Sequence, residues 1–159
     1  MFKFIDNHLE EMLLVFLLSL MSILIGVQVF MRYVMHDSLA WSEELARYCF
    51  IWATYIGVSY GVKKNAHIAV EAATDRLSAT LKPYARILSH VIFIVFAALV
   101  MKEGYALTLK IFAFGQKSSA MGLPMGYMYL APTIGFGLVI LRLLQKILEE
   151  MQTMRQGSN

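Results

Sequence analysis

Charge is scarce in this chain of 159 residues: only 16% are Asp, Glu, Lys or Arg, whereas 58% are hydrophobic. A typical soluble domain has about a quarter of its residues charged, so the composition excludes an ordinary soluble protein. The net charge of +3 is small, and the basic residues stand at the ends of apolar runs. That pattern suits lipid headgroups better than nucleic acid, so an integral membrane protein without a nucleic-acid partner is predicted.

Cysteine is nearly absent as well. Cys49 is the single cysteine, which excludes an internal disulfide and a cysteine metal site, and it is predicted to be a small core residue. The sequence has no phosphate-binding loop, nucleophile elbow, HExxH or CxxC motif, so no enzyme is expected. A haem anchor needs two histidines at matching depth, and only His90 lies near the interior of an apolar run. Neither a cofactor nor a metal is expected.

Four long apolar runs account for most of the chain. A membrane-spanning helix needs roughly 20 mainly apolar residues. Spans are predicted at about 12–33, 40–62, 84–112 and 124–145, the first being a retained anchor rather than a cleaved signal. Between the second and third, residues 66–82 place alanine, valine and leucine on one helical face and charges on the other, which is typical of a short amphipathic interfacial helix. Residues 1–159 are therefore predicted to form one all-α membrane domain.

The distribution of Lys and Arg predicts the orientation. With four spans, both termini lie on one side of the membrane. That side holds nine basic residues and the other side holds five. The positive-inside rule therefore places both termini in the cytoplasm.

The second predicted span begins with an unusual charged block, Trp41-x-Glu43-Glu44-x-x-Arg47. Spacings of three and four residues bring both carboxylates within reach of the Arg47 guanidinium if the segment is helical. The block is interpreted as an ordinary interfacial helix end, as an intersubunit lock, or as an ion relay. At the end of the first span, Arg32 either reaches lipid headgroups or pairs with Glu43 or Glu44 across the short loop. Asp37 or Ser38 is a candidate N-cap for the second helix.

Small and aromatic residues mark further contact surfaces. Ala53, Gly57 and Gly61 recur every four residues, which favours close helix packing within the four-helix unit over docking of a partner. Trp52 belongs to an aromatic stripe that also contains Trp41. Pro124 is predicted to open the fourth span. Pro132 inside that span frees backbone carbonyls, which must then find other partners.

No predicted span interior carries an Asp or Glu, and Glu103 falls near the far end of the third span. A transporter that moves a charged solute by itself is expected to keep polar groups at mid-membrane. The chain is therefore interpreted as a helper subunit rather than as the transporting subunit.

Several motifs, taken together, resemble one known family. The resemblance covers about residues 16–144 and is to the small, Q-type (DctQ-like) membrane subunit of tripartite ATP-independent periplasmic (TRAP) transporters. The residues that carry it are Phe30-x-Arg32-Tyr33, Trp41-x-Glu43-Glu44-x-x-Arg47-x-x-Phe50-x-Trp52-x-x-x-x-Gly57, His67-Ile68 and Leu123-Pro124-Met125-x-x-x-Tyr129-x-Ala131-Pro132-x-x-Gly135. One departure is that Ala69-Val70-Glu71 follows His67-Ile68, where the family commonly has a basic residue and then Val-Asp.

The resemblance implies a four-span protein of the bacterial inner membrane that takes no part in catalysis. It implies a heterodimer with a large multi-span permease subunit, which carries the substrate and sodium sites, and lipids at the subunit interface. A periplasmic binding protein, bound transiently, would deliver an organic acid of the C4-dicarboxylate or sialic acid type. The small subunit would brace the scaffold of the large one during sodium-driven uptake. Carried over by position, Arg32, Trp41, Glu43, Glu44 and Arg47 are docking or structural residues.

Two other functions remain as alternatives. A small four-span transporter that works by itself would need a membrane-embedded acid in its first span, and residues 12–33 contain none. A haem or quinone membrane anchor would show itself in the absorbance spectrum of the purified protein.

Overall fold

The computed structural model describes the backbone of residues 2–64 and 81–156, and the side chains of residues 8–64 and 81–152. Over these residues the chain is all-helical. The helices are α1 (Phe2–Tyr33), α2 (Ala40–Lys63), α4 (Lys82–Ala113) and α5 (Gly126–Gln156). A short link joins α1 to α2. The link between α4 and α5 contains one isolated pair of extended residues, Lys117 and Pro124.

These helices correspond to the four predicted spans, with two large differences in their bounds and others of one or two residues. Helix α1 begins about ten residues before the predicted span, and α5 continues about eleven residues beyond it. Both extensions are polar, so a hydropathy criterion for spanning residues omits them although their backbone is helical. Of the predicted interfacial helix, 66–80 lie outside the described residues, whereas Lys82 is the first residue of α4.

Three of the described helices are long and apolar enough to cross a membrane: His8–Tyr33 within α1, α4, and Gly126–Gln152 within α5. Helix α2 is not among them. Its first two turns contain Glu43, Glu44 and Arg47, which lower its mean hydropathy. A membrane-spanning role for α2 therefore stays a prediction.

The starts of two helices show how local sequence sets their bounds. Residue Pro83 lies in the first turn of α4, where a missing backbone N–H costs no helical hydrogen bond. The predicted capping of α2 by Asp37 or Ser38 is wrong, because the N-cap is Leu39 and no side chain caps the helix. The Ser38 hydroxyl instead lies 3.4 Å from the Arg32 guanidinium, which takes it away from the helix end.

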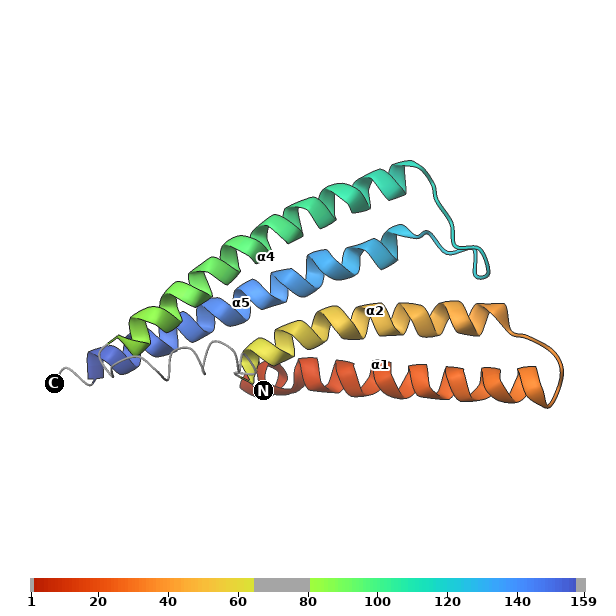
Figure 1. Ribbon diagram of the computed structural model, residues 1–159, viewed down its shortest axis with the longest axis horizontal. Coiled ribbons are helices and arrows are strands. Elements are labelled where there is room, and N and C mark those ends of the chain that lie inside the picture. Colours follow the sequence, from red (N-terminus) through yellow and green to blue (C-terminus); the bar gives the residue numbers. More distant parts are fainter. Residues whose placement is uncertain (1, 65–80, 157–159) are drawn as a thin grey trace.

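The four helices lie side by side in an open row rather than in a closed bundle (Figure 1). Helix α5 packs between α4 and α2, and α1 packs on the other side of α2. The core lies around α5, where Phe136 contacts the ring of Tyr55 from α2 and the ring of Phe96 from α4, with centroids 6.1 and 5.9 Å apart. Few residues of the apolar spanning segments are buried by the rest of the chain: the buried share of residues is 6% in α4 and 22% in α5. Most of their apolar surface therefore faces outward.

Close approach of helices depends on a glycine that the sequence analysis did not single out for packing. A Cβ atom at Gly135 of α5 would lie 2.6 Å from Cβ and 2.9 Å from the backbone oxygen of Tyr55, so only glycine lets α5 approach α2 this closely. Among the described residues, a Cβ at Gly57 would meet only a Leu14 methyl, at 3.8 Å, and a Cβ at Gly61 would meet nothing within 4 Å. Within this part of the chain, Gly57 therefore packs only loosely and Gly61 meets no neighbouring helix closely, whereas Ala53 is buried.

Pro132 has no N–H to donate to the Met128 carbonyl four residues before it, and the next carbonyl, that of Tyr129, receives a hydrogen bond from another helix. Helix α5 continues through Pro132, and the buried Thr108 hydroxyl of α4 lies 2.8 Å from the Tyr129 carbonyl oxygen, one turn before the proline. The same hydroxyl lies 2.8 Å from the Gly104 carbonyl of its own helix. A side chain of α4 therefore provides a donor at the point where the backbone pattern of α5 is disturbed.

Candidate functional site

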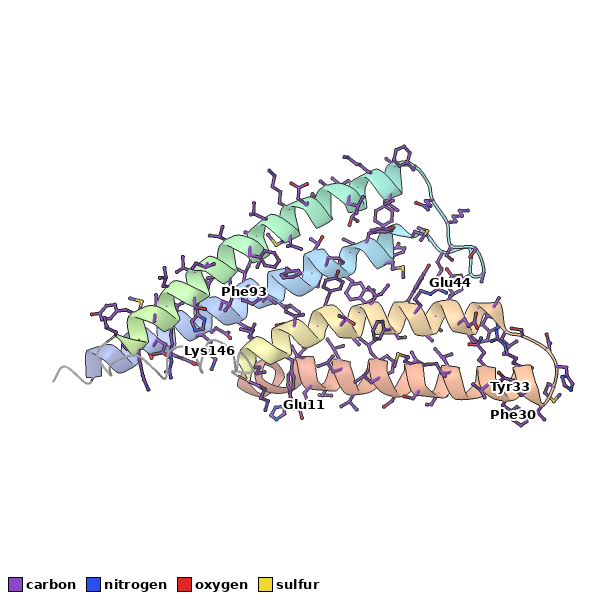
Figure 2. All side chains as sticks on the ribbon, viewed as in Figure 1. Glu11, Phe30, Tyr33, Glu44, Phe93 and Lys146 are labelled. Atoms are coloured by element: carbon purple, nitrogen blue, oxygen red, sulfur yellow. The ribbon has the colours of Figure 1, made fainter. Side chains whose placement is uncertain are left out.

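Polar side chains gather at the two ends of the helix row. One end is formed by the α1–α2 link, the start of α2 and the α4–α5 link. The other end is formed by the start of α1 and the ends of α2 and α5. Figure 2 shows Tyr33 and Glu44 at the first end and Glu11 and Lys146 at the second. Long apolar stretches of the helices separate the two ends, so each end is a candidate contact surface.

At the first end, Glu44 holds the α4–α5 link against α2, and this contact is called the Glu44 clamp. One carboxylate oxygen of Glu44 accepts hydrogen bonds from the backbone N–H groups of Ala120, at 2.8 Å, and Met121, at 3.2 Å. The other oxygen accepts the hydroxyl proton of Tyr48, at 2.7 Å. Glu44 is buried, and charge-assisted bonds of this kind are stronger than neutral ones. The clamp therefore connects segments that lie 76 residues apart.

The link has its own internal structure, which presents these two N–H groups together. The backbone N–H of Ser118 donates to the carbonyl of Leu123, and the Ser118 hydroxyl accepts from the Leu123 N–H. Gly122 has a φ of +68°, a conformation that favours glycine. The result is a tight turn whose tip residues, Ala120 and Met121, face Glu44. Pro124 lies at the end of this turn, two residues before α5 rather than inside it.

The structure separates the charges that the sequence analysis grouped together. An exposed ion pair joins Arg32 to Glu43 across the α1–α2 link, with Nη2 2.9 Å from Oε1. Glu44 forms the clamp. The predicted bridge from Arg47 to both carboxylates is therefore wrong, because each carboxylate has a better-placed partner. Arg47 is exposed and makes no ion pair or side-chain hydrogen bond within the described part of the chain.

The remaining predicted residues lie near this end or along α2. Trp41 is exposed at the first turn of α2. Trp52 is half-buried three turns further along the same helix. Gly57 and Gly61 lie towards the opposite end of α2, so these residues do not form one cluster with the charged block.

At the second end, Glu10 is fully buried and joins three helices; with Ser59, Lys63 and Arg142 it forms the Glu10 cluster. Its carboxylate accepts two hydrogen bonds from the Arg142 guanidinium of α5, at 2.7 and 3.1 Å. It also accepts from the Ser59 hydroxyl, at 3.0 Å, and the Lys63 ammonium, at 3.1 Å, both of α2. The two-pronged contact with Arg142 gives the cluster a defined geometry.

The Glu10 cluster is not among the sites predicted from the sequence. The predicted first span, 12–33, leaves Glu10 in a polar tail, and no role is predicted for Arg142. The sequence does hold one signal: Arg142 interrupts an otherwise apolar stretch near the end of the fourth span. A charge in that position needs a partner. Its partner could not be identified by spacing, since Glu10 and Arg142 are separated by 132 residues.

Comparison with known proteins identifies the family of the chain. Residues 21–153 match the DctQ component of the tripartite ATP-independent periplasmic transporters. This match confirms the resemblance inferred from the motifs. It includes the Glu44 clamp, Lys63 and Arg142, whereas Glu10 lies before its first residue.

Individual relatives agree with the family match. The chain is 32% identical over 149 residues to the isethionate TRAP transporter permease protein DctMQ of Oleidesulfovibrio alaskensis, covering 90% of this chain and 24% of that protein. It is 28% identical to a putative TRAP transporter small permease protein of Haemophilus influenzae, covering 89% and 87%. It is 29% identical to the C4-dicarboxylate TRAP transporter small permease protein DctQ of Vibrio cholerae, covering 62% and 42%. The chain thus spans most of one relative and less than half of the other two.

Proposed function

Because the chain belongs to the DctQ component family of tripartite ATP-independent periplasmic transporters, we propose that it is the non-catalytic small permease subunit of such a transporter and braces a large permease subunit. The chain is a multi-pass protein of the bacterial inner membrane. In the proposed orientation both termini are cytoplasmic, α2 is a fourth span, and the Glu44 clamp lies on the periplasmic side.

The observation that carries this proposal is the open helix row. A row of helices has two broad faces, and large apolar side chains stay exposed on the helices of this row, for example Ile23 of α1 and Ile92 of α4. One such face can contact lipid while the other packs on a partner. The Glu44 clamp and the Glu10 cluster tie the row together at its two ends. A row tied at both ends, with one broad face available to a partner, suits a brace. Such a brace would hold part of the large subunit fixed while the transport domain of that subunit moves.

Arg47 supports a partner at the clamp end of the row. The side chain is exposed, and no carboxylate of the described residues pairs with it. Charge at the boundary of a membrane protein commonly pairs with another group or reaches lipid headgroups. We assign Arg47 to an ion pair with an acidic residue of the large subunit, while Arg32, Trp41, Glu43 and Glu44 shape the surface around it.

The test is copurification of the tagged chain with its large permease subunit after the change Arg47→Glu. The expected result is loss of most of the copurifying subunit, because the reversed charge repels its acidic partner. The thermal unfolding midpoint of the chain is expected to change little, since Arg47 makes no ion pair or side-chain hydrogen bond within the described residues. Lys117→Glu, an equal charge reversal on the exposed α4–α5 link, is the matched control.

Two results would count against the proposal. If Arg47→Glu copurifies normally and uptake nevertheless stops, the docking role is wrong and a direct role in transport is favoured. If the purified chain alone transports an organic acid in liposomes, it is a self-sufficient transporter rather than a brace.

The proposed solute is an organic acid of the C4-dicarboxylate or sialic acid type, delivered by a periplasmic binding protein and driven by sodium. Relatives named for C4-dicarboxylate, sialic acid and isethionate support this class, because all three are organic anions. Uptake of labelled candidate acids by cells that hold the complete transporter, with sodium present or replaced by potassium, tests both the solute class and the coupling ion.

A further inference from the structure

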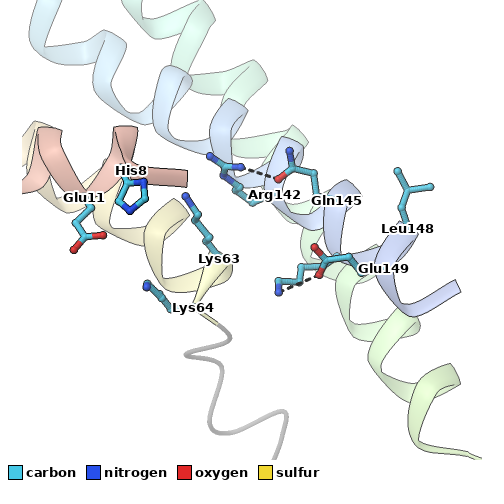
Figure 3. Close-up of a pocket in the computed structure, with 9 residues that line it drawn as sticks. His8, Glu11, Lys63, Lys64, Arg142, Gln145, Leu148 and Glu149 are labelled. Carbon is cyan, nitrogen blue, oxygen red and sulfur yellow. Dashed lines mark hydrogen bonds and ion pairs between the residues drawn. The ribbon is translucent and has the colours of Figure 1, made fainter. Parts of the chain in front are cut away.

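A cavity of about 650 Å³ opens beside the Glu10 cluster, at the end of the row opposite the Glu44 clamp (Figure 3). It lies where α1, α2 and α5 meet. Its volume falls in the range of small-molecule sites. The residues that line it are His8, Glu11, Lys63, Lys64, Arg142, Gln145, Lys146, Leu148 and Glu149. Neither the family match nor the proposed brace assigns a role to this cavity.

The lining of the cavity is cationic. It includes four permanent cations, Lys63, Lys64, Arg142 and Lys146, and only two carboxylates, Glu11 and Glu149. The carboxylate of Glu10 behind the wall lowers this excess but does not remove it, because one negative charge faces both Arg142 and Lys63. The site therefore favours an anion.

The Glu10 cluster also holds part of this lining in place. Arg142 is buried, its Nε and Nη2 bind Glu10, and its Nη1 binds the Gln145 side chain at 2.7 Å. Lys63 is tied to the same carboxylate. Fixed cations lose little side-chain freedom when a ligand binds, so this wall of the cavity is preorganised.

The position of the cavity indicates which anion it holds. The cavity adjoins the polar ends of two candidate spans, His8–Tyr33 and Gly126–Gln152, which is the level of lipid headgroups. Leu148, an exposed apolar side chain, lies on the lining with the cations. Basic pockets between membrane helices on the cytoplasmic side are suited to anionic headgroups. A phosphodiester with an attached acyl chain matches both the charged and the apolar parts of the lining.

We propose that this cavity binds the phosphodiester headgroup of an anionic phospholipid, with Lys64 and Lys146 contacting the phosphate at its exposed side. Lys64 is held near the cavity by its position over the Tyr60 ring, 5.5 Å from the ring centroid. The Lys146 ammonium lies 3.2 Å from the Glu149 carboxylate. Because the Glu149 side chain is exposed, it can move aside and leave Lys146 to contact a phosphate.

The experiment compares the full-length chain, in the assembly in which it purifies, in nanodiscs of phosphatidylcholine with and without phosphatidylglycerol. A headgroup that binds the folded chain is expected to raise the thermal unfolding midpoint by about 5 °C. Native mass spectrometry is expected to find phosphatidylglycerol retained on the chain. Lys64→Gln and Lys146→Gln should each weaken retention about fivefold, since each removes one cation at the headgroup.

Lys117→Gln is the matched control, because it removes an exposed cation at the opposite end of the row. The proposal is overturned if Lys117→Gln reduces retention as much as Lys64→Gln and Lys146→Gln do. It is also overturned if phosphatidylglycerol raises the midpoint no more than phosphatidylcholine does. Inorganic phosphate added to phosphatidylcholine nanodiscs separates a lipid from a free anion. Equal stabilisation by phosphate alone would contradict the lipid assignment.

Discussion

The sequence contains three pairs of adjacent glutamates, and in two of them, Glu10-Glu11 and Glu43-Glu44, one carboxylate is buried while its neighbour is exposed. Glu10 is enclosed by cations of two other helices, whereas Glu11 lies at the surface. Glu44 is enclosed by backbone N–H groups, whereas Glu43 forms an exposed ion pair. Adjacent helical residues point about 100° apart, so only one of each pair can face the interior. The buried members connect segments distant in the sequence.

The change Glu10→Gln tests the Glu10 cluster. The amide keeps the size of the side chain but removes the negative charge that balances Arg142 and Lys63. Removing one partner of a buried ion pair leaves charge uncompensated, so the free energy of unfolding is expected to fall by about 3 kcal/mol. Thermal or denaturant unfolding in detergent measures this change. Glu11→Gln, an identical change at the exposed neighbour, is expected to have almost no effect, and equal effects of the two changes would refute the role of Glu10.

Individual helices were the most predictable part of the structure. The bounds of α2 differ from the predicted span by one residue, because a helix-breaking turn precedes it and the charged Lys63-Lys64 pair ends its apolar run. Contacts between helices were much less predictable. Helical spacing predicts that Arg47 pairs with Glu43 and Glu44, because residues three or four apart lie on one helix face. Such a pair forms only when neither carboxylate has a stronger partner nearby. Here Arg32 and the α4–α5 link supply such partners.

Helix packing gives a prediction at the level of elements. Gly135→Ala would place a methyl group against the Tyr55 backbone and push α5 away from α2. Overpacking of this kind is expected to cost about 2 kcal/mol in unfolding free energy. Gly61→Ala is the control, since a Cβ there meets nothing within 4 Å among residues 8–64 and 81–152, and alanine favours a helix. The measurement is the thermal unfolding midpoint of each variant. An unchanged midpoint for Gly135→Ala would contradict the close approach of α5 to α2.

The whole molecule has a proposed orientation that can be tested with single cysteines. The native Cys49 is buried and can be replaced by serine to give a background for labelling. In that background, Met35→Cys on the α1–α2 link should react with a membrane-impermeant maleimide on intact spheroplasts. Met151→Cys near the end of α5 should react only after permeabilisation. Both native side chains are exposed, so burial does not confuse the comparison. Reversed labelling would place the termini in the periplasm.

The order of the helices in space differs from their order in the chain, and this was beyond sequence reasoning. Four spans with short links are compatible with a closed bundle as well as with a row. Periodicity shows which face of a helix is apolar, but in a membrane every face is apolar and lipid competes with protein for it. The choice of neighbours rests on single residues such as Gly135 and Arg142, whose partners only the folded chain reveals.

The bond between Glu10 and Arg142 has a consequence for biosynthesis. The ribosome makes the carboxylate first and its guanidinium partner 132 residues later, a delay of roughly ten seconds at ordinary elongation rates. During that interval Glu10, in the third turn of the first helix, lacks its principal counter-ion and must stay hydrated at the membrane surface. The first helix can therefore reach its final packing only after Arg142 has been synthesised. Nascent chains interrupted before Arg142 are expected to be substrates for membrane quality-control proteases.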